Sequence, residues 1–407
     1  MRKLLSRPIN YIIPLIVAFF NFLLILFPGD IVDAARGGLL LWFYNVLPAL
    51  LPFIIGTNIL AAMGFVGLLG KLLDPVMMAL FRVPGAGGFA LVTGMMSGYP
   101  MGAKTAATLA QSRQVSASQA WRLAAFCNNS GPLFILGAVG AGLFSSADVG
   151  YFIMFCHYAG AIFVGLIMAR FAGREAAAGQ YMPRDDKTGV SKPTPLGSAL
   201  VYSSREVRRR PKSFGETLGA SVKNAMETIV VIGGYIVLFA VIVRAVDILG
   251  VFEVSEILAQ PFLERLGIDD GLLTGIIVGM IEMTNGAMRL SEGGISAQTI
   301  AAVTFVVSFG GFSIHAQSIS FLAKAGISSG GYIAGKLLHA IVSAGLAFAA
   351  FGLLGAAPRE AAPAFFQSDA PIIRVFGYSS MLFLASILGF ITLAAICRIF
   401  VKKRRRR

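Results

Sequence analysis

Two polar, glycine-broken stretches lie inside sequence that is otherwise apolar enough to span a membrane. The first copy is SGYPMGAK at 97–104, which continues as NNSGP at 128–132. The second is EMTNG at 282–286, which continues as SFGGFS at 308–313. Because an unpaired backbone amide is costly in hydrocarbon, helices break there only where protein or a water-filled cavity pairs the exposed groups. Two such breaks in matching halves are typical of a carrier whose binding site lies near mid-membrane.

The composition places this chain among membrane proteins with several spans. Of its 407 residues, 56% are hydrophobic and 13% are charged, whereas a soluble domain carries about 25% charged residues. We therefore expect an all-α polytopic membrane protein with about eight transmembrane helices of roughly 20 residues each. The spans are expected at about 9–27, 37–62, 119–144, 148–171, 223–248, 298–323, 331–354 and 374–397. Two further apolar segments, at about 86–110 and 271–293, contain the first polar stretch of each half.

Positive charge gathers at three places beside these spans and predicts their orientation. The net charge is +14, and the basic residues cluster near the N-terminus (2–7), in the loop at about 172–222 and in the tail (402–407). Basic segments that flank spans are typical of the cytoplasmic side of a membrane. We therefore expect both termini in the cytoplasm, the lipid bilayer as the partner of the basic tail, and no binding of nucleic acid.

No pattern typical of an enzyme or of a metal site is visible. The three cysteines, Cys127, Cys156 and Cys397, lack metal-ligand spacing and lie in or beside spans. The three histidines form no H-E-x-x-H motif, and no P-loop, dinucleotide fingerprint or serine–histidine–acid arrangement occurs. We expect no catalytic activity, no metal and no cofactor.

The charge pattern also predicts that the two polar-centred segments enter the membrane and return to the same side. If both termini and the central loop are cytoplasmic, an even number of crossings must separate them. The number is even only if 86–110 and 271–293 are re-entrant hairpins. Basic residues flank the first hairpin, which should enter from the cytoplasm, whereas the second follows acidic residues and should enter from outside. Each half then contains a span, a re-entrant hairpin, a broken span and a span, in inverted-topology repeats.

This interpretation divides the chain into five parts. An N-terminal accessory span (1–36) precedes the first repeat (37–171). A basic cytoplasmic linker (172–222) joins that repeat to the second, inverted repeat (223–354). A C-terminal span with the basic tail (355–407) follows.

In the first half, the polar residues at the breaks are candidates for contacts with a solute. A helix that starts after the Pro100 interruption would direct its positive N-terminal end at an anion. Lys104 lies in the first turn of that helix, where it would either bind a substrate carboxylate or pair with a structural group. The other substrate-binding candidates of this half, whose alternative role is hydrogen bonding between helices, are Ser97, Asn128, Asn129 and Ser130.

In the second half, Glu282 is an acid within an apolar region. It is expected to coordinate a coupling cation, to carry a proton or to pair with Lys104. His315 is the other candidate for the coupling proton, because histidine titrates near neutral pH; a histidine satisfied in the core is the alternative. The substrate-binding candidates of this half are Thr284, Asn285, Ser308 and Ser313.

Several stretches resemble a known family. The combination of SGYPMGAK at 97–104 with NNSGPLFI at 128–135, together with the residues at 38–42, 46–53 and 81–85, resembles the YlbJ (SpoVV) family of sporulation integral membrane proteins. That family carries nucleoside-recognition Gate domains and is similar in plan to concentrative nucleoside transporters. The resemblance implies transport of dipicolinate, a pyridine dicarboxylate, from the mother cell toward the forespore across the outer forespore membrane.

From the residues alone, we predict a carrier of a small polar or anionic solute. It would work by alternating access between the paired hairpins, and the resemblance favours dipicolinate as the solute. The alternatives are a sodium- or proton-coupled nucleoside carrier and a non-transporting membrane assembly protein of the sporulation machinery. The coupling ion, the direction of transport and the formation of a homo-oligomer are left open.

Overall fold

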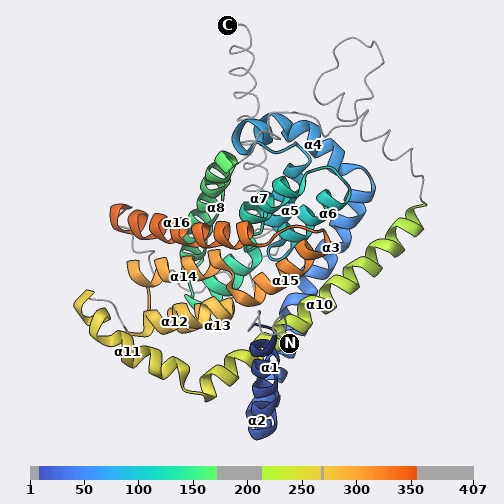
Figure 1. Cartoon of the computed structure of the whole chain (residues 1–407). Helices are drawn as coiled ribbons and strands as arrows, with labels where there is room; N and C mark the ends of the chain where they lie inside the picture. The colour runs from blue at the N-terminus through green and yellow to red at the C-terminus, as the bar shows by residue number, and fades with distance from the viewer. Residues whose placement is uncertain (1–8, 172–212, 267–269, 355–407) are drawn as a thin grey trace, which may run out of the picture.

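The structure, a computed structural model, describes residues 9–171, 213–266 and 270–354. Within these ranges every regular element is helical and no strand occurs, which confirms the predicted all-α class. Figure 1 shows short helices at the centre of the molecule, with the long helix α10 (Phe214–Ile248) running along one side.

The helices form two series of the same order. The pair α1 (Ile9–Leu26) and α2 (Pro28–Leu41) precedes both series. The first series comprises α3 (Leu47–Ala62), α4 (Phe65–Val76), α5 (Gly87–Ser97), α6 (Met101–Gln111), α7 (Ala117–Cys127), the π-helix η3 (Leu133–Leu143) and α8 (Ala147–Met168). The second comprises α10, α11 (Val251–Leu266), α12 (Asp270–Ile281), α13 (Met283–Ser291), α14 (Ala297–Phe309), α15 (Gly311–Lys324) and α16 (Gly330–Leu354). Short turns extend α2, α4 and α8, namely η1 (Trp42–Val46), η2 (Met77–Phe81) and η4 (Ala169–Phe171).

The helices break at the polar stretches. In the first half, Gly98 has a positive φ of 83° between α5 and α6, and Asn128 is extended between α7 and η3. In the second half, Glu282 is extended between α12 and α13, and Gly310 with a φ of 90° ends α14. Glycine adopts a positive φ without the steric penalty of a side chain. Helix breaks therefore occur at all four places where the sequence suggested them.

The two hairpins consist of helices that are too short to span a membrane. Helices α5 and α6 have 11 residues each, and α12 and α13 have 12 and 9. A crossing takes about 20 residues. The lengths agree with hairpins that enter the membrane and return.

In each half the hairpin packs backbone to backbone against the broken span that follows it. A Cβ atom at Gly98 would lie 2.7 Å from the amide nitrogen of Gly131. A Cβ atom at Gly311 would lie 3.1 Å from the carbonyl oxygen of Gly279. Small residues allow helix backbones to approach this closely in membranes. We call each hairpin together with its broken span a block.

The two blocks exchange contacts reciprocally. In the first half, α6 packs on α15 and α7 packs on α16. In the second half, the corresponding α13 packs on η3 and the corresponding α14 packs on α8. Two repeats related by a pseudo-two-fold axis produce this exchange. The direction in which each repeat faces in the membrane stays a prediction.

Four described helical stretches are long and apolar enough to be membrane spans. They are Ala147–Phe171, Phe214–Ile248, Ala297–Lys324 and Gly330–Gly352. The count rises to six if two bent pairs each form one span; α1 and α2 are bent by 103°, and α3 and α4 by 82°. The four stretches coincide with the spans predicted at 148–171, 223–248, 298–323 and 331–354, whereas the broken span predicted at 119–144 consists of α7 and η3, of 11 residues each. The two bent pairs overlap the spans predicted at 9–27 and 37–62, and the predicted span at 374–397 lies outside the described residues.

Two helices and one boundary differ from the sequence-based expectation. Helices α4 and α11 were not expected, because each carries charged residues and a proline and neither has the continuous apolar run of a span. Helix α10 begins at Phe214 rather than at about 223, because Ser213 and Glu216 form a capping box within the predicted linker. The rest of that linker (172–212) and the C-terminal part (355–407) lie outside the described residues.

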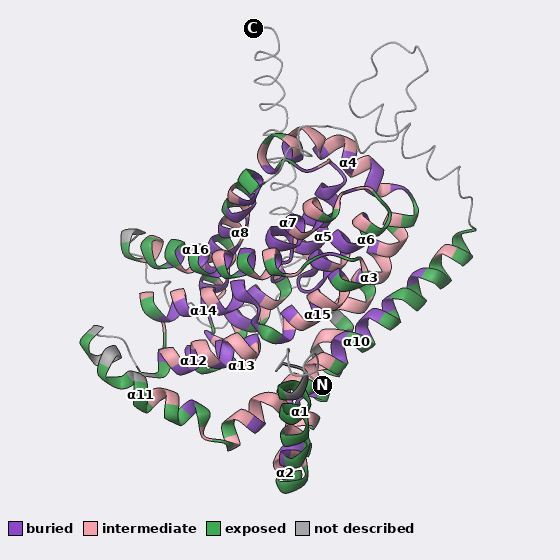
Figure 2. Cartoon of the chain, in the orientation of Figure 1, coloured by how far each residue is buried: buried purple, intermediate pink, exposed green. Residues whose placement is uncertain are grey.

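Apolar side chains are exposed on the outer helices. Figure 2 shows α1, α2, α10 and α11 largely exposed, whereas burial is concentrated in the helices around the breaks. Exposed apolar side chains on the outer helices include Ile25, at 76% exposed, and Phe155, at 71%. Such a surface suits contact with lipid, since exposed apolar patches of this kind mark membrane or protein contacts.

We expect the two ends of the first hairpin to lie on one side of the membrane. Arg82 precedes α5, Ser112 follows α6, and both are exposed. In a variant without the native cysteines, Arg82→Cys and Ser112→Cys should react with an impermeant maleimide from the same side. Gly271→Cys and Glu292→Cys, at the second hairpin, should react from the opposite side. Labelling of Arg82→Cys and Ser112→Cys from different sides would show that the hairpin crosses.

Gly94→Ala should destabilise the first block. The new methyl group would overlap the carbonyl oxygen of Cys127, a backbone atom held by the broken span. Overpacking of a filled site costs about 1–3 kcal/mol, so the unfolding temperature in detergent should fall. Gly137→Ala is the matched control, since no heavy atom lies within 4 Å of its Cβ position. Equal unfolding temperatures for the two variants would contradict the close contact.

Candidate solute-binding site

Asn128 joins the two halves of the molecule at the first break. Its Nδ2 donates to Ser318 Oγ and to Tyr332 OH, both at 2.9 Å. Its Oδ1 accepts from the backbone N–H of Ala103 at 3.2 Å. The residue is 0% exposed. The amide therefore performs the interhelical bonding that was the alternative to substrate binding, and it fixes α6 against α15 and α16.

A lysine of α16 lies beside the same break. Lys336 Nζ donates to the carbonyl oxygen of Asn128 at 2.8 Å and lies 2.8 Å from His339 Nδ1. It also lies 5.0 Å from the centroid of the Tyr99 ring, at the tip of the first hairpin. Lys336 is 0% exposed. The ion pairs found among the described residues all lie elsewhere, so no carboxylate of the described chain pairs with the Lys336 side chain.

His157 of α8 connects the breaks of the two halves. Its Nε2 accepts from the backbone N–H of Ser130 at 3.1 Å, and its Nδ1 lies 2.8 Å from Ser308 Oγ. Tyr99 also reaches the second break, where its OH donates to the carbonyl oxygens of Val307 at 3.2 Å and Ser308 at 3.0 Å. Ser130 and Ser308, predicted in opposite halves, thus belong to one hydrogen-bonded chain.

We call the residues that meet between the two breaks the central cluster. Its members are Tyr99, Asn128, Ser130, His157, Ser308, Tyr332, Lys336 and His339. Each is at most 8% exposed, so the cluster is closed to solvent. It offers one cationic side chain, hydroxyl groups, carbonyl oxygens and aromatic rings, and it contains no acid. This chemistry suits a small anion, and the described residues contain no group of three or more histidines, cysteines or acids that could hold a metal ion.

Four other predicted residues are buried without joining the cluster fully. Ser97 Oγ, Asn129 Oδ1 and His315 Nε2 have no hydrogen-bond partner within the described part of the chain. The other ring nitrogen of His315, Nδ1, lies 3.1 Å from the hydroxyl of Tyr332, a member of the central cluster. The fourth residue, Ser313, is 3% exposed. Buried polar atoms usually have a partner. The contacts of these residues with a solute stay predictions.

Lys104 lies outside the central cluster. Its Nζ donates to Asn224 Oδ1 at 2.9 Å and to Thr228 Oγ1 at 2.6 Å, both on α10. The side chain is half-buried. These are structural partners, one of the two roles that the sequence allowed for this lysine. A contact between Lys104 and a substrate stays a prediction.

The pairing of Glu282 with Lys104, one of three roles considered for this acid, does not form. Glu282 caps its own helix, because its Oε1 accepts from the N–H of Thr284 at 3.1 Å and its Oε2 from the N–H of Asn285 at 2.8 Å. An acid at this position satisfies amides that a helix start leaves unpaired, and it interacts favourably with the helix dipole. The role of Glu282 in coupling and the contacts of Thr284 and Asn285 with a solute stay predictions.

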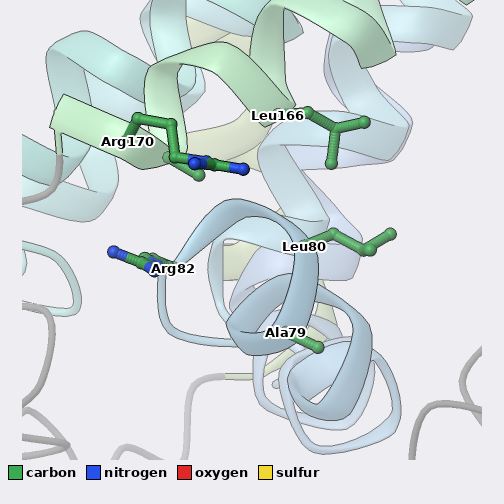
Figure 3. A pocket seen from close by; sticks show the side chains of 6 residues that line it. Ala79, Leu80, Arg82, Leu166 and Arg170 are labelled. Carbon is green, nitrogen blue, oxygen red and sulfur yellow. The ribbon is translucent and has the colours of Figure 1, made fainter.

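Two cavities of the described structure lie away from the central cluster. The larger, of about 470 Å³, is lined by Ala79, Leu80, Arg82, Leu166, Ala169 and Arg170. Figure 3 shows its two arginine side chains on the same side of the cavity. The smaller, of about 310 Å³, is lined by Glu256, Gly271, Leu272, Arg289, Leu290, Glu292, Gly293 and Thr299. Neither shares a residue with the cluster.

The sequence-based search missed the lysine and the histidine of α16. It treated 331–354 as an ordinary span, because that helix is not broken. The overlooked signal is KLLH at 336–339. Lysine and histidine are rare within spans and mark functional sites there, and residues three apart share one helix face.

Glu282→Ala should destabilise the second hairpin. Loss of a capping side chain costs about 0.5–2 kcal/mol, and Glu282→Asp, which keeps a carboxylate at the cap, should lose less. The free energy of unfolding in detergent is the measurement. Glu292→Ala is the control, since Glu292 is exposed at the other end of α13. If Glu282→Ala and Glu292→Ala were equally stable, the cap would contribute nothing.

Comparison with known proteins agrees with these features. A family model described as nucleoside recognition (Gate) matches residues 43–175. The chain is 36% identical over 336 residues to the sporulation integral membrane protein YlbJ of Bacillus subtilis (strain 168), a match that covers 81% of this chain and 80% of the relative. The search of solved structures found no match. With its broken helices and Gate region, the chain belongs to the YlbJ family of sporulation integral membrane proteins.

Proposed function

We propose that this protein carries dipicolinate across the membrane by alternating access of its two hairpin blocks. The observation that carries the proposal is the buried side-chain amine of Lys336, a group that can bind a proton, at the point where the breaks of both halves meet. The similarity to a sporulation membrane protein supports a role in sporulation. Transport from the mother cell toward the forespore, across the outer forespore membrane, is what the resemblance to that family implies.

The charge of Lys336 favours an anion as the solute. Its partners are a carbonyl oxygen and an imidazole nitrogen, which are both uncharged acceptors. A buried charge without a counter-charge is costly in low dielectric. A carboxylate beside Lys336 would supply that counter-charge. Dipicolinate has two carboxylates, and the helices α6 and α15, which start at the breaks, offer positive N-terminal ends for the second.

The aromatic side chains near Lys336 favour a flat ring. The Tyr99 ring lies beneath the ammonium. The His315 ring makes edge-on contacts with two other rings. Its centroid lies 5.4 Å from the centroid of the Tyr332 ring and 4.5 Å from the centroid of the Phe309 ring. Aromatic rings prefer such offset or edge-on contacts. A pyridine ring would find the same contacts at this place.

Transport requires the cluster to open. Asn128, His157 and Lys336 are each 0% exposed, so the structure represents a state closed to both sides. Movement of one block against the other would expose the cluster to one side at a time. Whether one chain or a homo-oligomer performs this movement stays open.

The two lysines give the test of this proposal. In proteoliposomes, wild-type protein should take up labelled dipicolinate, and Lys336→Met should abolish uptake because the site loses its only cationic side chain. Lys104→Met is measured in parallel, since methionine has a similar length and the Lys104 ammonium nitrogen donates to side chains of α10. Loss of uptake in Lys104→Met alone would return the anion site to the position suggested by the sequence. Full uptake by a folded Lys336→Met protein would overturn the proposal.

A neutral solute is the second candidate. The match to a nucleoside-recognition family model favours it, as does the similarity in plan to concentrative nucleoside transporters. A nucleoside gains nothing from a buried cation, so its uptake should tolerate Lys336→Met better than uptake of an anion does. Competition between labelled dipicolinate and unlabelled nucleoside in the same vesicles distinguishes the two solutes.

A further inference from the structure

Lys336 and His339 form a buried pair on one face of α16. Nζ of the lysine lies 2.8 Å from Nδ1 of the histidine, and both residues are 0% exposed. The other ring nitrogen, Nε2, lies 2.8 Å from the carbonyl oxygen of His157. Because a carbonyl oxygen can only accept, Nε2 carries a proton. The remaining nitrogen, Nδ1, faces the lysine.

This geometry allows the pair one net positive charge. If Lys336 is an ammonium, it donates to Nδ1 and the imidazole is neutral. If His339 is an imidazolium, Nδ1 donates and the lysine is a neutral amine. Protonation of both would set two donors with like charges 2.8 Å apart, which low dielectric disfavours. The pair therefore exists either with one shared charge or neutral.

No acid among the described residues faces this pair from the helices packed against it. The titratable groups that surround it are Tyr99 at the hairpin tip, Cys127 of α7, His157 and Tyr158 of α8, His315 of α15 and Tyr332 of α16. Helix α14 supplies none. His157 is held neutral, since its Nε2 accepts from a backbone N–H and its Nδ1 is then the donor to Ser308. The charge of the cluster thus depends on the Lys336–His339 pair.

We propose that the Lys336–His339 pair binds the proton that is transported together with each substrate anion. This inference rests on the proposed function. On one side of the membrane, the pair takes a proton from water, becomes positive and receives a carboxylate of the dianion. On the other side, the carboxylate and the proton both return to water. No bond of the solute is made or broken.

The empty carrier gives the physical reason for this coupling. When the solute has left, a permanent charge in the cluster would lack a counter-charge during the return movement, and such a charge is costly. A pair that loses its proton returns neutral. This requirement explains a lysine rather than an arginine at position 336, because lysine readily becomes neutral when buried and arginine stays charged.

Lys336→Arg is the sharpest test, because it keeps the positive charge and prevents its loss. Wild-type protein in vesicles should acidify the lumen, read with an internal pH dye, as labelled dipicolinate enters, and an acidic exterior should accelerate entry. Lys336→Arg should still bind dipicolinate, but repeated entry should slow because the empty carrier returns charged, and the entry that remains should no longer move protons or respond to the pH gradient. Unchanged proton movement per dipicolinate in Lys336→Arg would overturn the inference.

His339→Gln repeats the test without altering the lysine. Glutamine can accept from Lys336 but cannot take a proton, so the lysine alone would bind it, and the pH at which an acidic exterior accelerates entry should shift from that of the wild type. His315→Gln is measured in parallel, since His315 bonds Tyr332 rather than Lys336 and is the candidate for the coupling proton that the sequence suggested. A pH dependence of entry in His339→Gln equal to that of the wild type, or proton coupling that is lost only in His315→Gln, would overturn the inference. Absence of dipicolinate transport by the wild type would instead overturn the proposed function.

Discussion

The backbone groups that the helix breaks expose must be paired inside the protein, because hydrocarbon offers them no partner. Side chains of the opposite half meet this requirement. Lys336 of the second half bonds the Asn128 carbonyl of the first, and Tyr99 of the first half bonds the Val307 and Ser308 carbonyls of the second. Each half therefore supplies part of what the breaks of the other half lack, while His157 and Glu282 pair amides within their own halves, and the two halves are expected to fold as one unit.

The same requirement places polar side chains at the centre of the molecule. Partners that pair broken backbone must be polar, so tyrosine, asparagine, histidine and lysine gather where the two breaks meet. Only one of them, Lys336, supplies a cationic side chain to the central cluster, and no acid of the described chain balances it. Under the proposed function, this is how a site that arises from backbone pairing would acquire a preference for anions.

The sequence predicted where the helices break better than it predicted which residues pair the backbone groups exposed there. Glycine and proline act locally on the backbone, so Gly98 and Gly310 could be interpreted without knowledge of their neighbours. The partners of a break come from distant helices, and no local pattern links Lys336 to Asn128, 208 residues away. For the same reason the sequence favoured Lys104, which is near a break along the chain, although its side chain turns to α10. Helices α4 and α11 were missed because they are neither spans nor breaks.

The glycine contact between Gly98 and Gly131 has a mechanical consequence. Within a block, backbone touches backbone with no side chain between, so separating those elements would open a void that nothing fills. Between the halves, by contrast, many of the contacts at the centre are hydrogen bonds, and exchanging such a bond for one to water costs only about 0.5–1.5 kcal/mol. If the protein works as proposed, the contact between the two halves is therefore the one that would open, and water would enter it together with the solute.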